Sequence, residues 1–298
     1  MTHNLSHIAI DWGTSNFRAW LIDKDNHILS FKESDKGLLF LQQNKFESYL
    51  YQQIKDWYIP DLPIIMCGMV GSQKGWQEVP YIPFSEIMLK LPSSLAQVPN
   101  TQGFNIRIVA GCSLTNKHFD VMRGEETQTY GFLCENPNYT GLLCLPGTHS
   151  KWVICQDGIP LTFYSFLTGE LFNILSKYSI LSSMLRDSWD DASFRQGVNK
   201  AISNPALFSH FLFGIRAQSL LEEQSLIDPT SFLSGLSIGL ELSAMQSYIK
   251  EYQNITFIGN AKLMENYQKA INIISSNSQQ YDTTTATLMG IYYIVKSL

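Results

Sequence analysis

The chain has 298 residues, of which 45% are hydrophobic and 16% charged, and its net charge is −5 at pH 7. This length exceeds what one compact core usually needs, so we expect two domains. The absence of a Lys/Arg cluster argues against a nucleic-acid-binding surface. No apolar run approaches the roughly 20 residues that span a bilayer, which argues against a membrane protein.

The five cysteines are scattered along the sequence, without a C-x-x-C pair or a Cys/His spacing suited to zinc. We therefore expect reduced thiols in the core of a cytoplasmic protein. The N-terminal sequence MTHNLSHIAID has neither the basic region nor the apolar run of a signal peptide. A homodimer is compatible with the sequence, which carries no signal for oligomeric state.

The first half of the chain is predicted to contain both strands and helices. Alternation of apolar and polar residues, short polar turns and helical spacing indicate the elements. The predicted strands are 7–12, 17–23, 27–33, 62–70 and 105–111, the predicted helices are 46–58 and 123–135, and 71–103 is predicted to be mostly loop.

The same order of elements restarts near residue 140. Asp228-Pro229 is an N-cap residue followed by proline, which predicts the start of a long helix. The expected strands are GLLCLPG, KWVICQ, IPLTFYSF and 254–260, and the expected helices are 168–181, several within 186–229, 230–252, one after residue 260, and 283–298. We interpret the chain as an α/β protein made by duplication, with domains 1–136 and 137–298 and a boundary near Pro137.

Two segments share a strand, a Gly-Thr turn and a second strand: IAIDWGTSNFRAWLID (8–23) and LLCLPGTHSKWVICQD (142–157). A hairpin tip of glycine and hydroxyl residues presents N–H and O–H groups that can hold phosphate oxygens. Two such tips suggest that one nucleotide is held from both sides. The residues assigned to phosphate binding are Gly13, Thr14, Ser15 and Asn16 in the first tip and Gly147, Thr148, His149 and Ser150 in the second.

The two copies differ at one position, where Asp11 of the first is replaced by Leu145 in the second. Alone, an aspartate before a turn usually caps that turn. A pair of phosphate-binding tips requires a metal, and Mg²⁺ typically keeps several waters and uses one or two carboxylates. We therefore expect Asp11 to hold Mg²⁺ through water and to take part in catalysis.

Arg123, Glu125 and Glu126 begin the helix that links the two halves. Acidic residues in a first turn often do no more than match the helix dipole. Phosphoryl transfer to a hydroxyl also requires a carboxylate that accepts the proton, and Glu125 is the first choice, with Glu126 as the fallback. Arg123 offers a planar fork for the carboxylate of a substrate or for phosphate.

Further binding residues are expected in turns after strands. In the loop CGMVGSQKGW, Gly71, Ser72 and Trp76 are candidates for a sugar pocket, against the alternative of a mobile surface loop. The turn Gly259-Asn260-Ala261 is expected to pass under an adenine ring, against the alternative of an ordinary strand-to-helix turn. Lys151, directly after the second tip, is also assigned to substrate binding.

Other nucleotide and hydrolase patterns are absent or out of context. The sequence contains neither G-x-x-x-x-G-K-[ST] nor G-x-G-x-x-G. GLSIG (235–239) fits the serine-hydrolase pattern G-x-S-x-G, but a helix signal precedes it and no histidine follows His210. We instead expect Gly235 and Gly239 to share one helix face that packs closely.

The segments IAIDWGTSNFRAWL, GMVGSQKGW, VMRGEETQ, LPGTHSKWV, FLTGEL and FLSGLSIGLE, in this order, resemble the 2-dehydro-3-deoxygalactonokinase family. The resemblance implies the actin/hexokinase/Hsp70 ATPase fold, with two RNase H-like domains and ATP in an interdomain cleft. It implies phosphorylation of 2-dehydro-3-deoxy-D-galactonate at the 6-hydroxyl. It also implies an adenosine motif at Gly259 to Lys262 and a second connecting helix at Thr284 to Gly290.

The sequence departs from this family pattern in places. The adenosine turn carries one glycine where the superfamily often has two, and Thr284 replaces an aspartate of relatives. Two alternatives stand beside the main hypothesis: a kinase of a different sugar or sugar acid on the same fold, and a non-catalytic actin-like ATP-binding protein.

Overall fold

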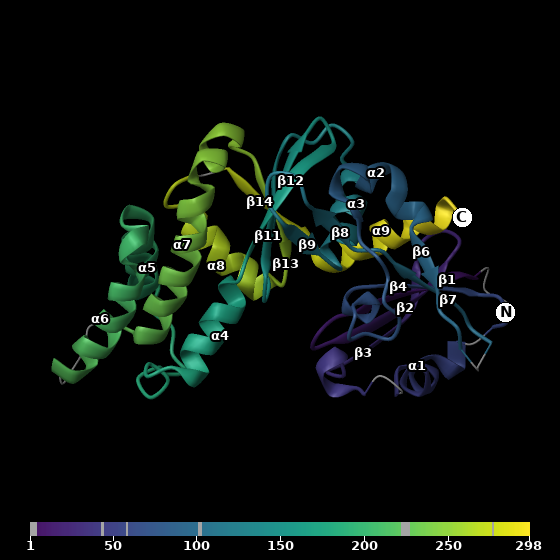
Figure 1. The fold of residues 1–298 in the computed structure, drawn as a ribbon, viewed down its shortest axis with the longest axis horizontal. Helices are drawn as coiled ribbons and strands as arrows, with labels where there is room; N and C mark the ends of the chain where they lie inside the picture. The colour runs from purple at the N-terminus through teal and green to yellow at the C-terminus, as the bar shows by residue number, and fades with distance from the viewer. Residues whose placement is uncertain (1–4, 43–44, 58, 101–102, 222–226, 276) are drawn as a thin grey trace. The chain divides into compact units, whose positions relative to one another are not determined.

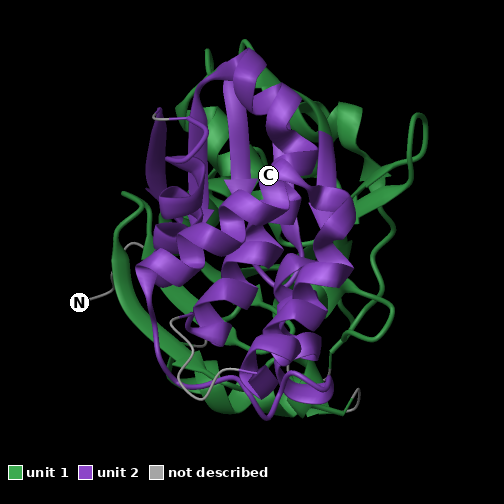
Figure 2. Ribbon diagram, turned by 90° about the vertical axis from the view of Figure 1, so that its left-hand side faces the viewer, with its two compact units in different colours: residues 1–139, 155–162, 283–298 green, residues 140–154, 163–282 purple. Residues whose placement is uncertain are grey.

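The chain forms two compact units of α/β structure (Figure 2). The computed structural model describes residues 5–298 except 43–44, 58, 101–102, 222–226 and 276. Unit 1 comprises residues 1–139, 155–162 and 283–298, and unit 2 comprises 140–154 and 163–282. The domain boundary expected near Pro137 stays a prediction.

Unit 1 is built on a six-stranded sheet in the order β3-β2-β1-β4-β7-β6 (Figure 1). Strands β1, β2 and β3 are antiparallel, β1, β4 and β7 are parallel, and β6 is antiparallel to β7. Strands β1 and β4 are parallel, so their carboxyl ends lie at the same end of the sheet. Asp11 and Cys67 are register partners there. The strands are β1 (Leu5–Trp12), β2 (Phe17–Asp23), β3 (Ile28–Ser34), β4 (Pro63–Cys67), β6 (Leu95–Gln97) and β7 (Asn105–Val109).

The core of unit 1 is centred on Trp12, which is fully buried. Its ring lies edge-on to Phe17 at 4.8 Å and to Phe46 at 5.1 Å, measured between ring centroids. Helix α1 (Phe46–Ile54) buries residues at a spacing of four, which is the spacing of one helix face. The helix predicted over 46–58 is confirmed, with a 3₁₀ turn at Lys55–Trp57; Tyr58 lies outside the described residues.

The segment 71–103, predicted to be mostly loop, contains several short elements. They are β5 (Ile82–Pro83), α2 (Ile87–Lys90) and β6, and β5 joins β8 (Cys112–Leu114) and β9 (Asp120–Met122) in a second, three-stranded sheet. Strands and α-helix cover only a small part of this segment, and these elements of two to four residues are too short to show a period in the sequence. The strand expected over 62–70 ends at Cys67, where a 3₁₀ turn follows at Met69–Gly71.

Two helices of unit 1 lie along each other, α3 (Glu125–Glu135) and α9 (Thr283–Lys296) (Figure 1). At their contact, a Cβ added to Gly290 would clash with the backbone carbonyl of Thr127. This close approach fixes the first turn of α3, which carries the candidate catalytic carboxylates.

The five-stranded sheet, most of which lies in unit 2, repeats the strand order of the six-stranded sheet of unit 1. Its strands lie in the order β12-β11-β10-β13-β14, which matches β3-β2-β1-β4-β7 position by position. The bounds are β10 (Gly141–Leu145), β11 (Ser150–Gln156), β12 (Ile159–Phe166), β13 (Ile255–Gly259) and β14 (Ser278–Asp282). The duplication predicted from the sequence is therefore confirmed by the sheet order. Strand β14 was missed because its sequence, SQQYD, is polar and only partly buried.

Unit 2 also contains most of the helices, which are α4 (Thr168–Tyr178), α5 (Asp191–Ser203), α6 (Phe208–Leu221), α7 (Pro229–Tyr252) and α8 (Ala261–Ile271). The predicted N-cap of α7 is confirmed, because Asp228 accepts a hydrogen bond from the Ser231 amide at 2.8 Å. Among the residues that the structure describes, no helix has the length and apolar character needed to cross a bilayer.

The segment GLSIG lies inside α7, which packs against α5 (Figure 1). A Cβ added to Gly235 would clash with the carbonyl of Phe194, and one added to Gly239 would lie 2.7 Å from the carbonyl of Val198. The interpretation of these glycines as a packing face, and not a nucleophile elbow, is confirmed.

We expect Gly235→Ala to lower the free energy of unfolding by roughly 1–3 kcal/mol, because the new methyl group meets backbone that cannot yield easily. Gly214 of α6 is the matched control, since a Cβ added there would meet nothing within 4 Å beyond its own helix backbone, among the residues that the structure describes. Gly214→Ala should raise stability by about 0.4–1 kcal/mol through the unfolded state. Chemical denaturation of both variants measures this, and equal shifts would contradict the packing argument.

Candidate active site

The first Gly-Thr tip joins β1 to β2 and is closed by a hydrogen bond from the Gly13 amide to the Asn16 carbonyl at 2.9 Å. Thr14, Ser15 and Asn16 are exposed. The carbonyls of Gly13, Thr14 and Ser15 accept hydrogen bonds from the amides of residues 38, 39 and 37, at 3.0–3.1 Å. Because amides of residues 37–39 occupy these carbonyls, the exposed side of the tip presents mainly N–H and O–H groups. Such donor groups are what an anion requires.

The second tip matches the first in exposure at its first three residues and differs at the fourth. Gly147 is half-buried, Thr148 and His149 are exposed, and Ser150 is fully buried. The amide of Glu170, in the first turn of α4, donates to the Thr148 carbonyl at 2.9 Å. The Glu170 carboxylate also pairs with His149 Nε2 at 2.6 Å.

The two tips share a support that the sequence analysis missed. Gly37 lies three residues after Ser34, the end of β3, and Gly169 lies three residues after Phe166, the end of β12. A Cβ added to Gly37 would clash with the backbone of Ser15, and one added to Gly169 with the carbonyl of Gly147. In the sequence, the signal was a glycine at the same distance after the third strand of each half.

Asp11 lies at the end of β1, directly opposite Arg18 on β2. Its Oδ2 atom is 2.7 Å from Arg18 Nη2, and its side chain is 13% exposed. Burial raises the pKa of Asp11, and the charge and hydrogen bond of Arg18 counteract this rise. Arg18 was missed, although counting outward from the tip pairs positions 11 and 18.

The donor set at Asp11 fits Mg²⁺ held through water. One carboxylate oxygen is paired with Arg18, and the other is an oxygen ligand of the hard type that Mg²⁺ prefers. An ion that retains its water shell suits a single carboxylate already engaged with a cation.

The two candidate bases, both in the first turn of α3, differ in burial and in hydrogen bonding. Glu126 is fully buried, and accepts hydrogen bonds from the Gly124 amide at 2.6 Å and the Thr127 hydroxyl at 3.0 Å. Burial, with the nearby charge of Glu125, raises the pKa of Glu126 to about 8. Glu125 is half-buried and accepts from the Arg123 amide at 3.1 Å. Glu125 is therefore the more accessible carboxylate.

The buried thiol of Cys67 lies close to Asp11 and to Glu126. Burial raises its pKa well above the usual value, and the charges of both carboxyl groups add to the rise. The ends of β1 and β4 and the start of α3 thus bring these three side chains together within unit 1.

Arg123 is buried, with 8% of its surface exposed. Its Nη2 donates to the Val79 carbonyl at 2.7 Å, and its guanidinium lies over the Tyr81 ring at 4.3 Å. Its Nε and Nη1 find no hydrogen-bond partner among the residues that the structure describes. A buried cation with two unused donors is costly unless an anion reaches it.

The loop that was expected to bind sugar lies next to Arg123. A Cβ added to Gly71 would lie 2.9 Å from Arg123 Nη1, and the buried Ser72 hydroxyl has no partner within the described part of the chain. Trp76 is partly buried, and its ring stacks on Phe46 at a centroid distance of 6.3 Å. Its role in substrate binding stays a prediction.

The remaining candidates belong to unit 2. Lys151 is buried in β11, with its Nζ 3.4 Å from the His149 carbonyl, and its predicted contact with substrate is not tested. Asn260 caps α8 by accepting from the Lys262 amide at 3.1 Å. A Cβ added to Gly259 would lie 3.4 Å from Pro146, so the turn 259–261 is a neighbour of the second tip.

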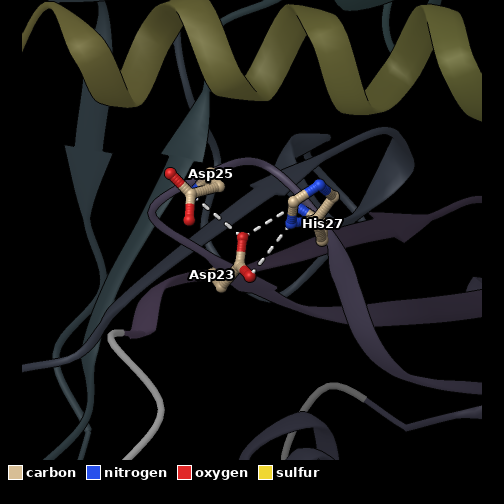
Figure 3. A group of neighbouring side chains, drawn as sticks. All are labelled: Asp23, Asp25 and His27. Atoms are coloured by element: carbon tan, nitrogen blue, oxygen red, sulfur yellow. Dashed lines mark hydrogen bonds and ion pairs between the residues drawn. The ribbon is translucent and has the colours of Figure 1, made fainter.

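One further cluster, Asp23, Asp25 and His27, lies in the turn between β2 and β3 (Figure 3). The Asp23 carboxylate accepts from the amides of Asp25 at 2.9 Å and His27 at 2.8 Å, and these bonds, that of His27 foremost, lower its pKa. Asn26 adopts a left-handed φ of 63°. The cluster is explained by closure of the turn.

Two units with the same strand order, each with a Gly-Thr hairpin at its first two strands, define a protein of the actin-like ATPase fold. Component A of (R)-2-hydroxyglutaryl-CoA dehydratase from Acidaminococcus fermentans is similar in fold, with a TM-score of 0.53 at 9% identity over 98% of each chain.

The 2-keto-3-deoxy-galactonokinase family model matches residues 11–294, and the chain belongs to this family. The chain is 33% identical to 2-dehydro-3-deoxygalactonokinase of Escherichia coli (strain K12), over 98% of both. It is also 33% identical to the Rhizobium meliloti (strain 1021) protein named "Probable 2-dehydro-3-deoxygalactonokinase DgoK1", over 95% of this chain and 94% of that one.

A crystal structure of a 2-dehydro-3-deoxygalactonokinase protein from Sinorhizobium meliloti has a TM-score of 0.91 to this chain. The two are 32% identical, and the match covers 98% of this chain and 96% of the other.

The buried Glu126 carboxyl predicts a pH dependence of stability. Its pKa in the folded protein is about 8, above the ordinary 4.5. Between these values the folded state keeps a proton that the unfolded state releases, so stability falls as the pH rises through this window. Glu126→Gln should flatten this dependence by an amount on the order of a few kcal/mol.

Chemical denaturation of both proteins at pH 5 and pH 8 measures this difference. Parallel losses of stability in the wild type and in Glu126→Gln would show that the carboxyl does not hold its proton.

Proposed function

We propose that the protein transfers the γ-phosphoryl group of ATP to the 6-hydroxyl of 2-dehydro-3-deoxy-D-galactonate, giving 2-dehydro-3-deoxy-6-phosphogalactonate and ADP. The observation that carries the proposal is the family match over residues 11–294, supported by relatives at 33% identity. The five free cysteines support a reducing compartment, the cytoplasm, as its location.

The two Gly-Thr tips are assigned to the phosphates of ATP. Backbone amides bind three carbonyls of the first tip and the Thr148 carbonyl of the second, and the exposed residues offer N–H and O–H groups, which supports this role for Gly13–Asn16 and for Gly147–Thr148. The turn 259–261, a neighbour of the second tip, is assigned to the adenosine.

Mg²⁺ bound to ATP would be held by Asp11 through water, and would neutralise charge on the β- and γ-phosphates. Arg18 orients the Asp11 carboxylate by its hydrogen bond at 2.7 Å. The ion pair with Arg18 also compensates the negative charge of this largely buried carboxylate.

Glu125 is assigned as the group that accepts the proton of the 6-hydroxyl. As the proton moves to Glu125, the hydroxyl oxygen bonds to the γ-phosphorus and the bond to the leaving ADP oxygen breaks. Glu126 is less suited to this role, because it is fully buried, engaged by Gly124 and Thr127, and protonated below a pH of about 8.

Arg123 is assigned to the carboxylate of the sugar acid. Its Nε and Nη1 have no partner among the described residues, and a guanidinium is a good donor group for a carboxylate. The Ser72 hydroxyl in the neighbouring loop, which has no partner among the described residues, offers a further donor. This arrangement favours an acid over a neutral sugar.

The proposal is tested by measuring ADP release in a coupled assay, with ATP and Mg²⁺, across a panel of 2-keto-3-deoxy sugar acids. We expect turnover that depends on the sugar acid and is fastest with 2-dehydro-3-deoxygalactonate. ADP release that no sugar acid stimulates would favour the non-catalytic alternative, and a preference for another acid would correct the substrate.

In this assay Asp11→Ala should lower kcat by about 10²–10⁴, the range expected on loss of a preorganised electrostatic group. Asp25→Ala is the matched control, since Asp25 is an exposed carboxylate in the β2–β3 turn. Asp25→Ala should stay within about twofold of the wild type. Equal rates for both variants would remove Asp11 from the mechanism.

Arg123→Lys should raise KM for the sugar acid by roughly ten- to a hundredfold, because one ammonium cannot replace the fork that binds carboxylate. The KM for ATP should change little. Arg195→Lys, at an exposed position on α5, is the control. A rise in KM for ATP alone would assign Arg123 to phosphate instead.

A further inference from the structure

A buried carboxylate in unit 2, Glu241 on α7, is surrounded by hydrogen-bond donors. Only 2% of its surface is exposed. Its Oε1 accepts from Trp152 Nε1 at 2.6 Å, and its Oε2 accepts from the Tyr267 hydroxyl at 2.8 Å and from the Thr168 hydroxyl. Burial raises the pKa of Glu241, and the hydrogen bonds of these three groups counteract the rise.

The network extends to the second Gly-Thr tip through Ser150. The Ser150 hydroxyl lies 2.7 Å from the Tyr267 hydroxyl, which in turn donates to Glu241 Oε2, so Ser150 is linked to the carboxylate through Tyr267. The Ser150 side chain therefore points into the core, where the residue is fully buried. Ser150 is the last residue of the tip and the first of β11.

The other end of the network is Thr168, the first residue of α4. The next two residues contact the tip: Gly169 packs against Gly147, and the Glu170 amide donates to the Thr148 carbonyl. One carboxylate thus ties down both Ser150 within the tip and the helix start behind it.

The two tips differ in how much backbone support they have. Three amides, of residues 37, 38 and 39, bind the carbonyls of the first tip. Within the described residues, the Glu170 amide is the single backbone donor to the carbonyls of 147–149. The second tip therefore depends on side chains for the support that the first receives from backbone.

We propose that Glu241 is a positioning residue that holds the 147–150 tip, through Ser150 and Thr168, in the geometry that binds nucleotide phosphate. The proposal rests on the proposed function in taking this tip as a phosphate site. It adds a residue far from the tip in sequence, and it assigns Ser150 to support of the tip, not to ligand contact through its hydroxyl.

Thr168 offers the sharpest test, because Thr168→Val removes one donor with little change of shape and Thr168→Ser keeps the hydroxyl. Isothermal titration with Mg²⁺ and AMP-PNP, an ATP analogue that is not hydrolysed, measures nucleotide binding without turnover. We expect Kd to rise roughly tenfold in Thr168→Val and to stay within about twofold in Thr168→Ser. Glu241→Gln, which replaces one acceptor oxygen by a donor, should weaken binding similarly.

A steady-state comparison separates positioning from a general loss of structure. In Thr168→Val the KM for ATP should rise with Kd, while the KM for the sugar acid stays within about twofold. Unchanged Kd in both Thr168→Val and Glu241→Gln would overturn the proposal, as would a lower melting temperature with both KM values unchanged.

The proposed function and this inference fail differently. Wild-type protein that binds Mg²⁺ and AMP-PNP but shows no turnover with any sugar acid would overturn the kinase assignment and leave the role of Glu241 standing. Wild-type protein that does not bind the analogue at all would overturn both.

Discussion

The proposed nucleotide site depends on one constraint, which is that a hairpin tip must keep its N–H groups outward if it is to bind an anion. A short turn does this best when other groups bind its carbonyls; three amides do so at the first tip, and the Glu170 amide does so at Thr148 of the second. A glycine three residues after the third strand lets a following segment approach each tip. The feature repeated in the two units is therefore a Gly-Thr tip together with the glycine-containing segment that packs against it.

Around this common plan the two units have diverged in their buried charges. Unit 1 carries Asp11, Glu126 and Arg123 near the ends of its parallel strands and the start of α3. Unit 2 has Leu145 in place of Asp11, and its buried carboxylate, Glu241, is fully engaged with donors of its own unit. The chemistry of phosphoryl transfer is accordingly assigned to unit 1, and support of the nucleotide to unit 2.

Much of the fold could be predicted because its signals are local. The two hairpins, the cap at Asp228 and the glycine face of α7 were all predicted from patterns of a few residues, and the structure confirms them. Several elements were missed, namely β5, α2, β6, β8, β9 and β14, and all of them are short or polar. Of these, β5 and β14 pair with strands that are distant in sequence. Arg18 could have been found from hairpin register alone.

The sequence by itself determined the duplicated order of elements, the two tips and the family, since periodicity and motif spacing are properties of contiguous residues. Only the tertiary structure distinguished Glu125 from Glu126 by their burial and hydrogen bonds. It also showed that two nitrogens of Arg123 have no partner among the described residues. A hydrogen bond between Trp152 and Glu241, 89 positions apart, could likewise be found only there. The physical reason is that burial and hydrogen-bond partners decide what a charged side chain can do. Both are set by contacts between segments that the linear sequence keeps apart.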